Sequence, residues 1–223
     1  QYENVGSLKE PDFEKIAEID PDLILISGRQ STLYDQLVEL APTVYVGLDT
    51  TRYMDSFKEN MHVIGKIFDK EAEIEEELGK IEESIAALNE KVSETDQNAL
   101  IILANDDKIS AYGPQSRFGI IHDVLGIPAA DEGIEVSTHG MNVSFEYVVE
   151  KDPSILYVVD RGAVVEGGES SAKQIVENKL MQSTKAYQND NIVYLNPDFW
   201  YLSGGGLISV QEMINEIGAS LEK

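Results

Sequence analysis

Residues 13–24 read FEKIAEIDPDLI, and residues 145–156 repeat the same pattern as FEYVVEKDPSIL. In each copy, a segment with apolar residues at helical spacing ends at Asp-Pro, and an apolar run of strand length follows. Extending the alignment without a gap places Arg29 opposite Arg161, each just past its strand. An Asp-Pro stop between helix and strand is common, but an ungapped match that reaches an arginine is harder to obtain by chance. We therefore interpret the stretches as a duplicated helix–strand unit, one copy in each of two lobes.

The rest of the chain alternates helical segments with apolar runs of strand length. The expected strands lie at residues 22–27, 43–46, 99–103, 155–159 and 192–195. This alternation predicts an α/β protein with central, mainly parallel sheets. Ligands of open α/β sheets bind beyond the carboxyl ends of the strands, so we expect Arg29 and Arg161 to face a cleft between the lobes.

Residues 53–92 show a charged helical pattern that no proline interrupts. A helix of about 20 residues spans about 30 Å, the width of a small domain. A surface helix with a solvated acidic face and a rigid strut between two lobes both fit this pattern. We therefore expect an N-terminal lobe at residues 1–68, an inter-lobe helix at 69–94 and a C-terminal lobe at 95–223.

The composition excludes several classes of protein. The chain of 223 residues contains no cysteine, which rules out disulfides, zinc ribbons and thiol catalysis. Its formal net charge of -24 disfavours binding to nucleic acid and to anionic membranes. An acidic protein that binds an anion must gather its few cations in one place, and the only arginines are Arg29, Arg52, Arg117 and Arg161.

Three further segments carry side chains suited to a ligand. Arg117 lies between two glycines in GPQSRFG, at residues 113–119, and His139 precedes a glycine in the polar loop at 137–140. Trp200 and Tyr201 precede the glycine run at 204–206. Arginine binds anionic oxygens and stacks on aromatic rings, while histidine and tyrosinate are iron ligands, so together they suit a bulky aromatic anion. Taken singly, the histidine also fits ordinary polar surface and Trp-Tyr also fits a core.

Six short stretches resemble the catecholate-siderophore branch of the cluster A (class III) solute-binding proteins of ABC importers. They are EPDFE at 10–14, DLILISGRQS at 22–31, GPQSRFG at 113–119, THG at 138–140, VVDR at 158–161 and WYL at 200–202. The resemblance implies the helical-backbone periplasmic binding protein fold, with two lobes joined by one long α-helix. It also implies an extracytoplasmic monomer, periplasmic or lipid-anchored, that hands a ferric siderophore to an ABC permease. Members of that family begin earlier in the chain, so we expect the first lobe to be incomplete.

The same resemblance assigns roles to individual residues. It implies that Arg29, Arg117 and Arg161 hold the catecholate oxygens, with Trp200 beside the ligand. His139 and Tyr201 would complete the coordination of Fe(III) when a siderophore supplies only four donors. No intrinsic cofactor is implied, because the iron arrives as the siderophore complex. Glu14 and Glu146, which are equivalent in the repeat, would dock onto permease arginines, although solvated helix carboxylates are the plainer interpretation.

Other functions remain open from the sequence. Haem, cobalamin or a hydroxamate siderophore could replace the catecholate, although three arginines favour a more anionic complex than a neutral hydroxamate. A two-lobed chelatase-like enzyme is the second alternative. The chain has no Gly-x-Ser-x-Gly elbow and no phosphate loop, so we expect it not to be an enzyme. We expect no nucleic-acid partner, and contact with the membrane only through a lipid anchor or the permease.

Overall fold

The computed structural model describes residues 2–105, 107–165 and 172–222. The chain divides into two compact units, Gln1–Asp49 and Thr50–Lys223. Both units combine helices with a sheet that contains parallel strand pairs, which confirms the predicted α/β class. None of the described helices combines the length and the apolar character that a membrane crossing needs.

The first unit is a small α/β layer. Its elements are α1 (Phe13–Ile19), β1 (Ile24–Ile26), the 3₁₀-helix η1 (Gly28–Leu33), α2 (Tyr34–Val38) and β2 (Thr43–Tyr45). The strands β1 and β2 pair in parallel, with Ile24 opposite Thr43. Ile16, Ile26 and Leu37 form its buried core, so one residue each from α1, β1 and α2 holds the layer together.

The second unit is built on a five-stranded mixed sheet in the order β5-β4-β3-β6-β7. Its strands are β3 (Ala99–Asn105), β4 (Lys108–Tyr112), β5 (Met141–Val143), β6 (Ile155–Asp160) and β7 (Ile192–Leu195). The strands β3, β6 and β7 are parallel, whereas β4 and β5 continue the sheet in antiparallel pairs. All six residues of β6 are buried, as expected for a central strand with both faces covered.

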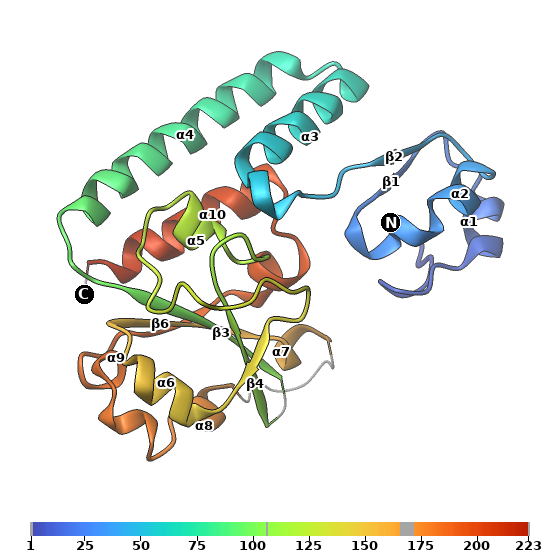
Figure 1. Cartoon of the computed structure of the whole chain (residues 1–223). Helices are drawn as coiled ribbons and strands as arrows, with labels where there is room; N and C mark the ends of the chain where they lie inside the picture. The colour runs from blue at the N-terminus through green and yellow to red at the C-terminus, as the bar shows by residue number, and fades with distance from the viewer. Residues whose placement is uncertain (1, 106, 166–171, 223) are drawn as a thin grey trace. The chain divides into compact units, whose positions relative to one another are not determined.

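Helices cover both faces of this sheet (Figure 1). Alternate residues such as Leu100 and Val158 pack with Val148 and Val176 of the helices on one face. On the other face, the Tyr157 hydroxyl pairs with Ser220 Oγ of the C-terminal helix at 2.8 Å. The helical elements are η2 (Thr50–Arg52), α3 (Tyr53–Phe68), α4 (Glu71–Ser93), α5 (Ile120–Asp123), α6 (Phe145–Lys151), α7 (Gly162–Val165), α8 (Ala172–Val176), η3 (Met181–Ser183), α9 (Lys185–Gln188), the π-helix η4 (Asp198–Leu202) and α10 (Leu207–Ser220).

The long helical pattern at residues 53–92 folds as a hairpin of α3 and α4 (Figure 1). The pattern breaks at Asp69, which adopts a left-handed conformation with φ 53°. Gly65 allows the two helices to approach, because a Cβ there would lie 3.1 Å from Ile74 Cγ1 and 3.3 Å from the Glu71 Cα. Across the hairpin, Lys58 pairs with Glu82.

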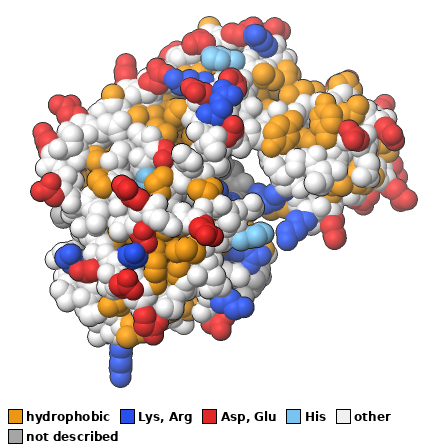
Figure 2. Space-filling view, in the orientation of Figure 1, with side chains coloured by type: hydrophobic (Ala, Val, Ile, Leu, Met, Phe, Trp, Pro, Cys, Tyr) orange, Lys and Arg blue, Asp and Glu red, His pale blue; other side chains and the backbone are white. Residues whose placement is uncertain are grey.

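The helix α4 has one buried face and one charged face. Its buried residues Ile74, Leu78, Ile81 and Leu88 recur at steps of three, four and seven. Figure 2 shows acidic side chains with a few basic ones along the top of the view, where Figure 1 places α3 and α4. This fits the interpretation of a surface helix with a solvated acidic face.

The unit boundary after Asp49 lies before the boundary expected at residue 68, because α3 packs against α4 and belongs to the second unit. The assignment of residues 1–68 and 95–223 to two lobes, with 69–94 as the joining helix, stays a prediction.

The sequence repeat corresponds to a repeat of backbone conformation. Both α1 and α6 have seven residues, and they end at Asp20 (φ 49°) and Asp152 (φ 42°) in the left-handed region. Aspartate tolerates this conformation, and the proline that follows cannot continue the helix. The strands β1 and β6 come next, so Arg29 lies at the start of η1 and Arg161 lies between β6 and α7.

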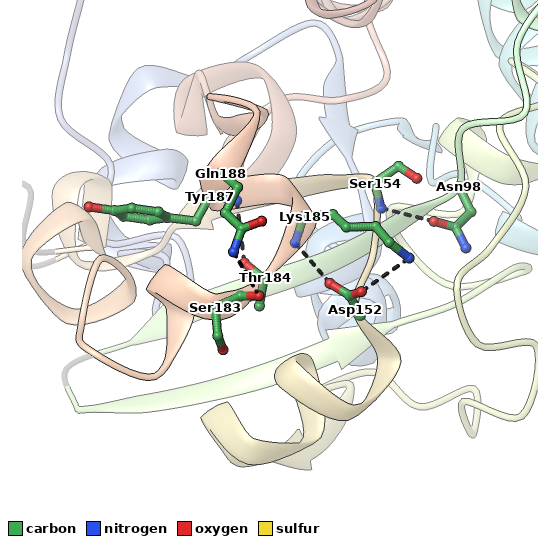
Figure 3. Close-up of polar contacts among 8 residues, drawn as sticks. All are labelled: Asn98, Asp152, Ser154, Ser183, Thr184, Lys185, Tyr187 and Gln188. Atoms are coloured by element: carbon green, nitrogen blue, oxygen red, sulfur yellow. Dashed lines mark hydrogen bonds and ion pairs between the residues drawn. The ribbon is translucent and has the colours of Figure 1, made fainter.

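The second copy uses its Asp-Pro junction for an additional contact (Figure 3). The Asp152 carboxylate accepts a hydrogen bond from the Lys185 backbone N–H at 2.8 Å and pairs with its Nζ at 3.1 Å. This contact lowers the pKa of Asp152 and ties the start of α9 to the end of α6. Beside it, the Ser154 backbone N–H donates to Asn98 Oδ1 at 2.9 Å, which joins β6 to the segment before β3.

Candidate functional site

Two of the predicted arginines converge on the predicted tyrosine in the second unit. Arg117 Nη2 donates to the Tyr201 carbonyl oxygen at 2.9 Å, and its guanidinium carbon lies 4.5 Å from the Tyr201 ring centroid. Arg161 Nε donates to the Tyr201 phenolic oxygen at 3.1 Å. Arg161 Nη1 also donates to Asn105 Oδ1. We call Asn105, Arg117, Arg161 and Tyr201 the Tyr201 cluster.

The sheet topology explains how three members of the Tyr201 cluster meet. Asn105 ends β3, Arg161 follows β6, and Tyr201 lies on η4 after β7. These three strands are parallel neighbours, so their carboxyl ends lie at one edge of the sheet. Arg117 reaches the cluster differently, from the loop after the antiparallel strand β4.

The loop at residues 113–119 is tightly folded and presents Arg117. Ser116 is buried, and its hydroxyl donates to the Gly113 carbonyl at 2.5 Å. Gln115, with φ 60°, donates its backbone N–H to Asp123 Oδ2 at 2.6 Å. A Cβ at Gly119 would lie 2.6 Å from that carboxylate oxygen, so only glycine fits there.

Tyr201 is held by a short π-helix that is anchored to α10. Glu216 accepts hydrogen bonds from the Asn196 backbone N–H at 3.0 Å and from Trp200 Nε1 at 2.7 Å. π-Helical turns occur frequently at functional sites. Trp200 is 3% exposed. Its ring lies in the core and its N–H is bonded to Glu216, and its place beside the ligand stays a prediction.

His139 lies on an exposed turn that begins the path to β5. The turn is closed by the Ser137 hydroxyl, which donates to the Gly140 carbonyl at 2.9 Å, and by the Gly140 N–H, which donates to the Ser137 carbonyl at 3.2 Å. The role of His139 as an iron ligand stays a prediction.

One member of the Tyr201 cluster, Asn105, and one residue beside it, Tyr112, carry no sequence motif. Asn105 fixes one end of the Arg161 guanidinium. Tyr112 is buried, and burial raises the pKa of its phenol, an effect that the Arg117 charge partly offsets. The one signal in the sequence for either residue is its position at the end of an apolar run.

Arg29, Glu14 and Glu146 also lie in the repeat, where Arg29 matches Arg161 and Glu14 matches Glu146. Arg29 is half-buried in η1, where Ser31 Oγ donates to the Gly28 carbonyl at 2.9 Å. It belongs to the first unit, and its participation in the same site as Arg161 stays a prediction. Glu14 and Glu146 are exposed in the first turns of α1 and α6. Hydrogen bonds from its own backbone and from Ser144 lower the pKa of Glu146.

Comparison with known proteins identifies the family. The family model described as "Periplasmic binding protein" matches residues 1–199. The petrobactin-binding protein YclQ of Bacillus subtilis is 51% identical over all of this chain and 70% of its own length. The crystal structure of YclQ superposes with a TM-score of 0.96 over 100% of this chain and 78% of that one.

Two further relatives are more distant. The periplasmic catecholate-siderophore binding protein VctP of Vibrio cholerae is 32% identical, with a TM-score of 0.93 over 98% of this chain and 78% of its own. The ferric-anguibactin-binding protein FatB of Vibrio anguillarum is 30% identical over 96% of this chain and 68% of its own. The match of the family model over most of the sequence, together with these identities, shows that the chain belongs to the periplasmic binding protein family.

Proposed function

We propose that this chain is an extracytoplasmic binding protein that captures an anionic ferric catecholate siderophore and delivers it to the permease of an ABC importer. The observation that carries the proposal is the convergence of Arg117 and Arg161 on Tyr201. The names of relatives that bind petrobactin, ferric anguibactin and catecholate siderophores support it. The chain is proposed to bind and release its ligand without transforming it.

The charges of the Tyr201 cluster suit a ferric catecholate. Each catecholate brings two anionic oxygens, and guanidinium groups bind such oxygens through paired N–H donors. In a chain with a net charge of -24, Arg117 and Arg161 supply a local positive patch. Arg29, which holds the position of Arg161 in the repeat, is proposed to contribute the third cation.

Tyr201 is also proposed to bind the iron directly through its phenolic oxygen. A siderophore with two catechol groups supplies four donors to Fe(III) and leaves two positions open. We assign these positions to Tyr201 Oη and the His139 imidazole. A bound metal ion stabilises the phenolate, and an N–H donor from Arg161 stabilises negative charge on the same oxygen. Glu14 and Glu146 are assigned to the permease contact.

The test is a titration with three ferric ligands, followed by the fluorescence of Trp200, which is the single tryptophan. The ligands are a complex with two catechol groups, a complex with three, and a neutral hydroxamate. We expect the two-catechol complex to quench Trp200 with a Kd below about 1 μM, which corresponds to about -8 kcal/mol. Weaker binding than that, or tighter binding of the neutral hydroxamate, would contradict the proposal.

The double variant with His139→Ala and Tyr201→Phe separates coordination from charge recognition. It removes both proposed iron ligands and leaves the arginines in place. We expect it to weaken the two-catechol complex and to leave the three-catechol complex, which needs no protein donor, nearly unchanged. Equal losses for both complexes would reject direct coordination of iron by the protein.

A further inference from the structure

A continuous column of packed groups connects the His139 turn to Tyr201. The Tyr112 ring lies 4.7 Å from the Phe118 ring, edge to face at 67°. The Arg117 guanidinium carbon lies 4.9 Å from the Phe118 centroid and 4.5 Å from the Tyr201 centroid. At the other end, Tyr112 contacts Gly140, the residue after His139. We call Gly140, Tyr112, Phe118, Arg117 and Tyr201 the aromatic column.

The contact between Gly140 and Tyr112 leaves no room for another side chain. A Cβ at Gly140 would lie 2.7 Å from both Cε2 and Cζ of the Tyr112 ring. The φ of Gly140 is +71°, which also favours glycine. The turn that contains His139 therefore lies directly against the buried Tyr112 ring.

The residues packed around Tyr112 and Phe118 hold the middle of the aromatic column in place. Tyr112 is 1% exposed and Phe118 is fully buried. Tyr112 ends β4, and Phe118 belongs to the loop that Ser116 and Asp123 hold closed. Close-packed interiors transmit displacements between neighbours, so a shift of Tyr112 reaches both ends of the column.

We propose that Tyr112 is a positioning residue that sets the separation between His139 and Tyr201, and thereby favours siderophores that leave two iron positions open. The inference rests on the proposed function, because it concerns the same two iron ligands. Tyr112 itself is unsuited to bind iron, since its side chain is buried whereas Tyr201 is partly exposed. Supporting residues of this kind matter because metal ligands must be held in place by their neighbours, and their substitution costs about 10–100-fold in metal affinity.

The test compares Tyr112→Leu with the conservative variant Tyr112→Phe. Leucine removes the ring that supports Gly140, whereas phenylalanine retains it. We expect Tyr112→Leu to lose about tenfold or more in affinity for the two-catechol complex and to retain most of its affinity for the three-catechol complex. We expect Tyr112→Phe to match the wild type with both. The charge-transfer absorption of the bound two-catechol complex should revert toward that of the free complex in Tyr112→Leu alone.

A second pair of variants reaches the same contact from the opposite side. Gly140→Ala pushes the turn away from Tyr112, and Gly126→Ala is its control, since Gly126 has a similar φ of +75° but faces Asn89 of α4. We expect the selective loss in Gly140→Ala only. Both variants place alanine at a positive φ, so they carry the same backbone strain. The pair therefore tests the positioning role of Tyr112 even if circular dichroism shows that Tyr112→Leu does not fold.

The outcomes separate the two proposals. A wild-type protein that does not bind the two-catechol complex overturns the proposed function. A wild-type protein that binds it, with an unchanged ratio of two-catechol to three-catechol affinity in Gly140→Ala and in folded Tyr112→Leu, overturns the positioning role of Tyr112 and leaves the proposed function standing.

Discussion

Arg161 donates a hydrogen bond from Nε to the phenolic oxygen of Tyr201 at 3.1 Å. The two residues come from separate strand ends, one after β6 and the other after β7. The same guanidinium also donates to Asn105 at the end of β3. A single planar cation therefore links the ends of β3 and β6 to the segment after β7, and it is oriented toward the phenol.

The first prediction concerns this arrangement. In Arg161→Lys the charge is retained, but one ammonium group cannot reproduce the fixed fork that reaches both Asn105 and Tyr201. We expect affinity for the two-catechol ferric complex to fall by about tenfold, which is about 1.4 kcal/mol, in a fluorescence titration. The control is Arg52→Lys, since Arg52 ends η2 and pairs with Glu59 of α3 at exposed positions. Equal losses in both variants would point to a general charge effect.

The second prediction concerns the anchor of η4. Glu216→Ala removes the acceptor of both the Trp200 indole and the Asn196 backbone N–H. A buried donor left without a partner costs about 1–3 kcal/mol, so urea unfolding should show a loss of that size in the free energy of unfolding. Glu212→Ala, at an exposed position of the same helix, serves as the control and should change little. Comparable losses from both would assign the effect to the helix.

The third prediction concerns pH. Burial lowers the pKa of His122 from its ordinary value of 6.5, while its Nδ1 lies 2.7 Å from the Ile127 carbonyl oxygen. The unfolded chain therefore takes up a proton more readily than the folded one, and the stability from the neutral ring is lost as pH falls from about 6.5 through the folded pKa.

Urea unfolding between about pH 5 and 7 checks this sign. In His122→Gln the contribution of this group to the pH slope should vanish, whereas His62→Gln, which removes a histidine of α3 that lies beside Glu75 of α4, should keep it. A wild-type slope that survives His122→Gln would contradict the assignment.

The fourth prediction compares two glycines. Gly79 lies within α4 and a Cβ there meets nothing within 4 Å, so Gly79→Ala should raise the free energy of unfolding by roughly 0.5–1 kcal/mol. A Cβ at Gly119 would crowd Asp123 and two backbone nitrogens, so Gly119→Ala should destabilise the protein and displace Arg117. Thermal unfolding and ligand affinity, measured on both variants, distinguish the two effects. Stabilisation by Gly119→Ala would show that the loop is less tightly closed than described.

The fifth prediction concerns delivery. Glu146→Arg reverses the charge at an exposed position in the first turn of α6. We expect transport through the permease in proteoliposomes to fall while the affinity for the ferric ligand stays unchanged. Glu150→Arg is the matched control, since Glu150 is exposed near the other end of the same helix. Loss of transport in both would implicate the net charge of the face.

Several features of the fold and site follow directly from local sequence. The helix–Asp-Pro–strand repeat is visible because each junction needs a left-handed Asp followed by Pro. It correctly places Arg161 past a buried strand. The approach of Arg117 and Arg161 to Tyr201 was expected only from the family resemblance, and the structure brings these three together.

Other features depend on contacts that local patterns do not reveal. The break at Asp69 has no proline to mark it, and its hairpin depends on the fit of Gly65 against α4. The burial of Trp200 depends on Glu216, which is close to it only in three dimensions. In the sequence, Tyr112 looks like any other aromatic residue at a strand end. Its contact with Gly140 is visible only in the folded structure.

The contrast between a strongly acidic chain and the compact cationic Tyr201 cluster also has a kinetic consequence. At low ionic strength the long-range field of a protein with a charge of -24 slows the approach of an anion, although the short-range contacts hold it once it is bound. Added salt shortens the reach of that field to about 10 Å at 0.1 M, so capture should become faster as salt rises. Encounter and retention of the ferric ligand would then respond to salt in opposite directions.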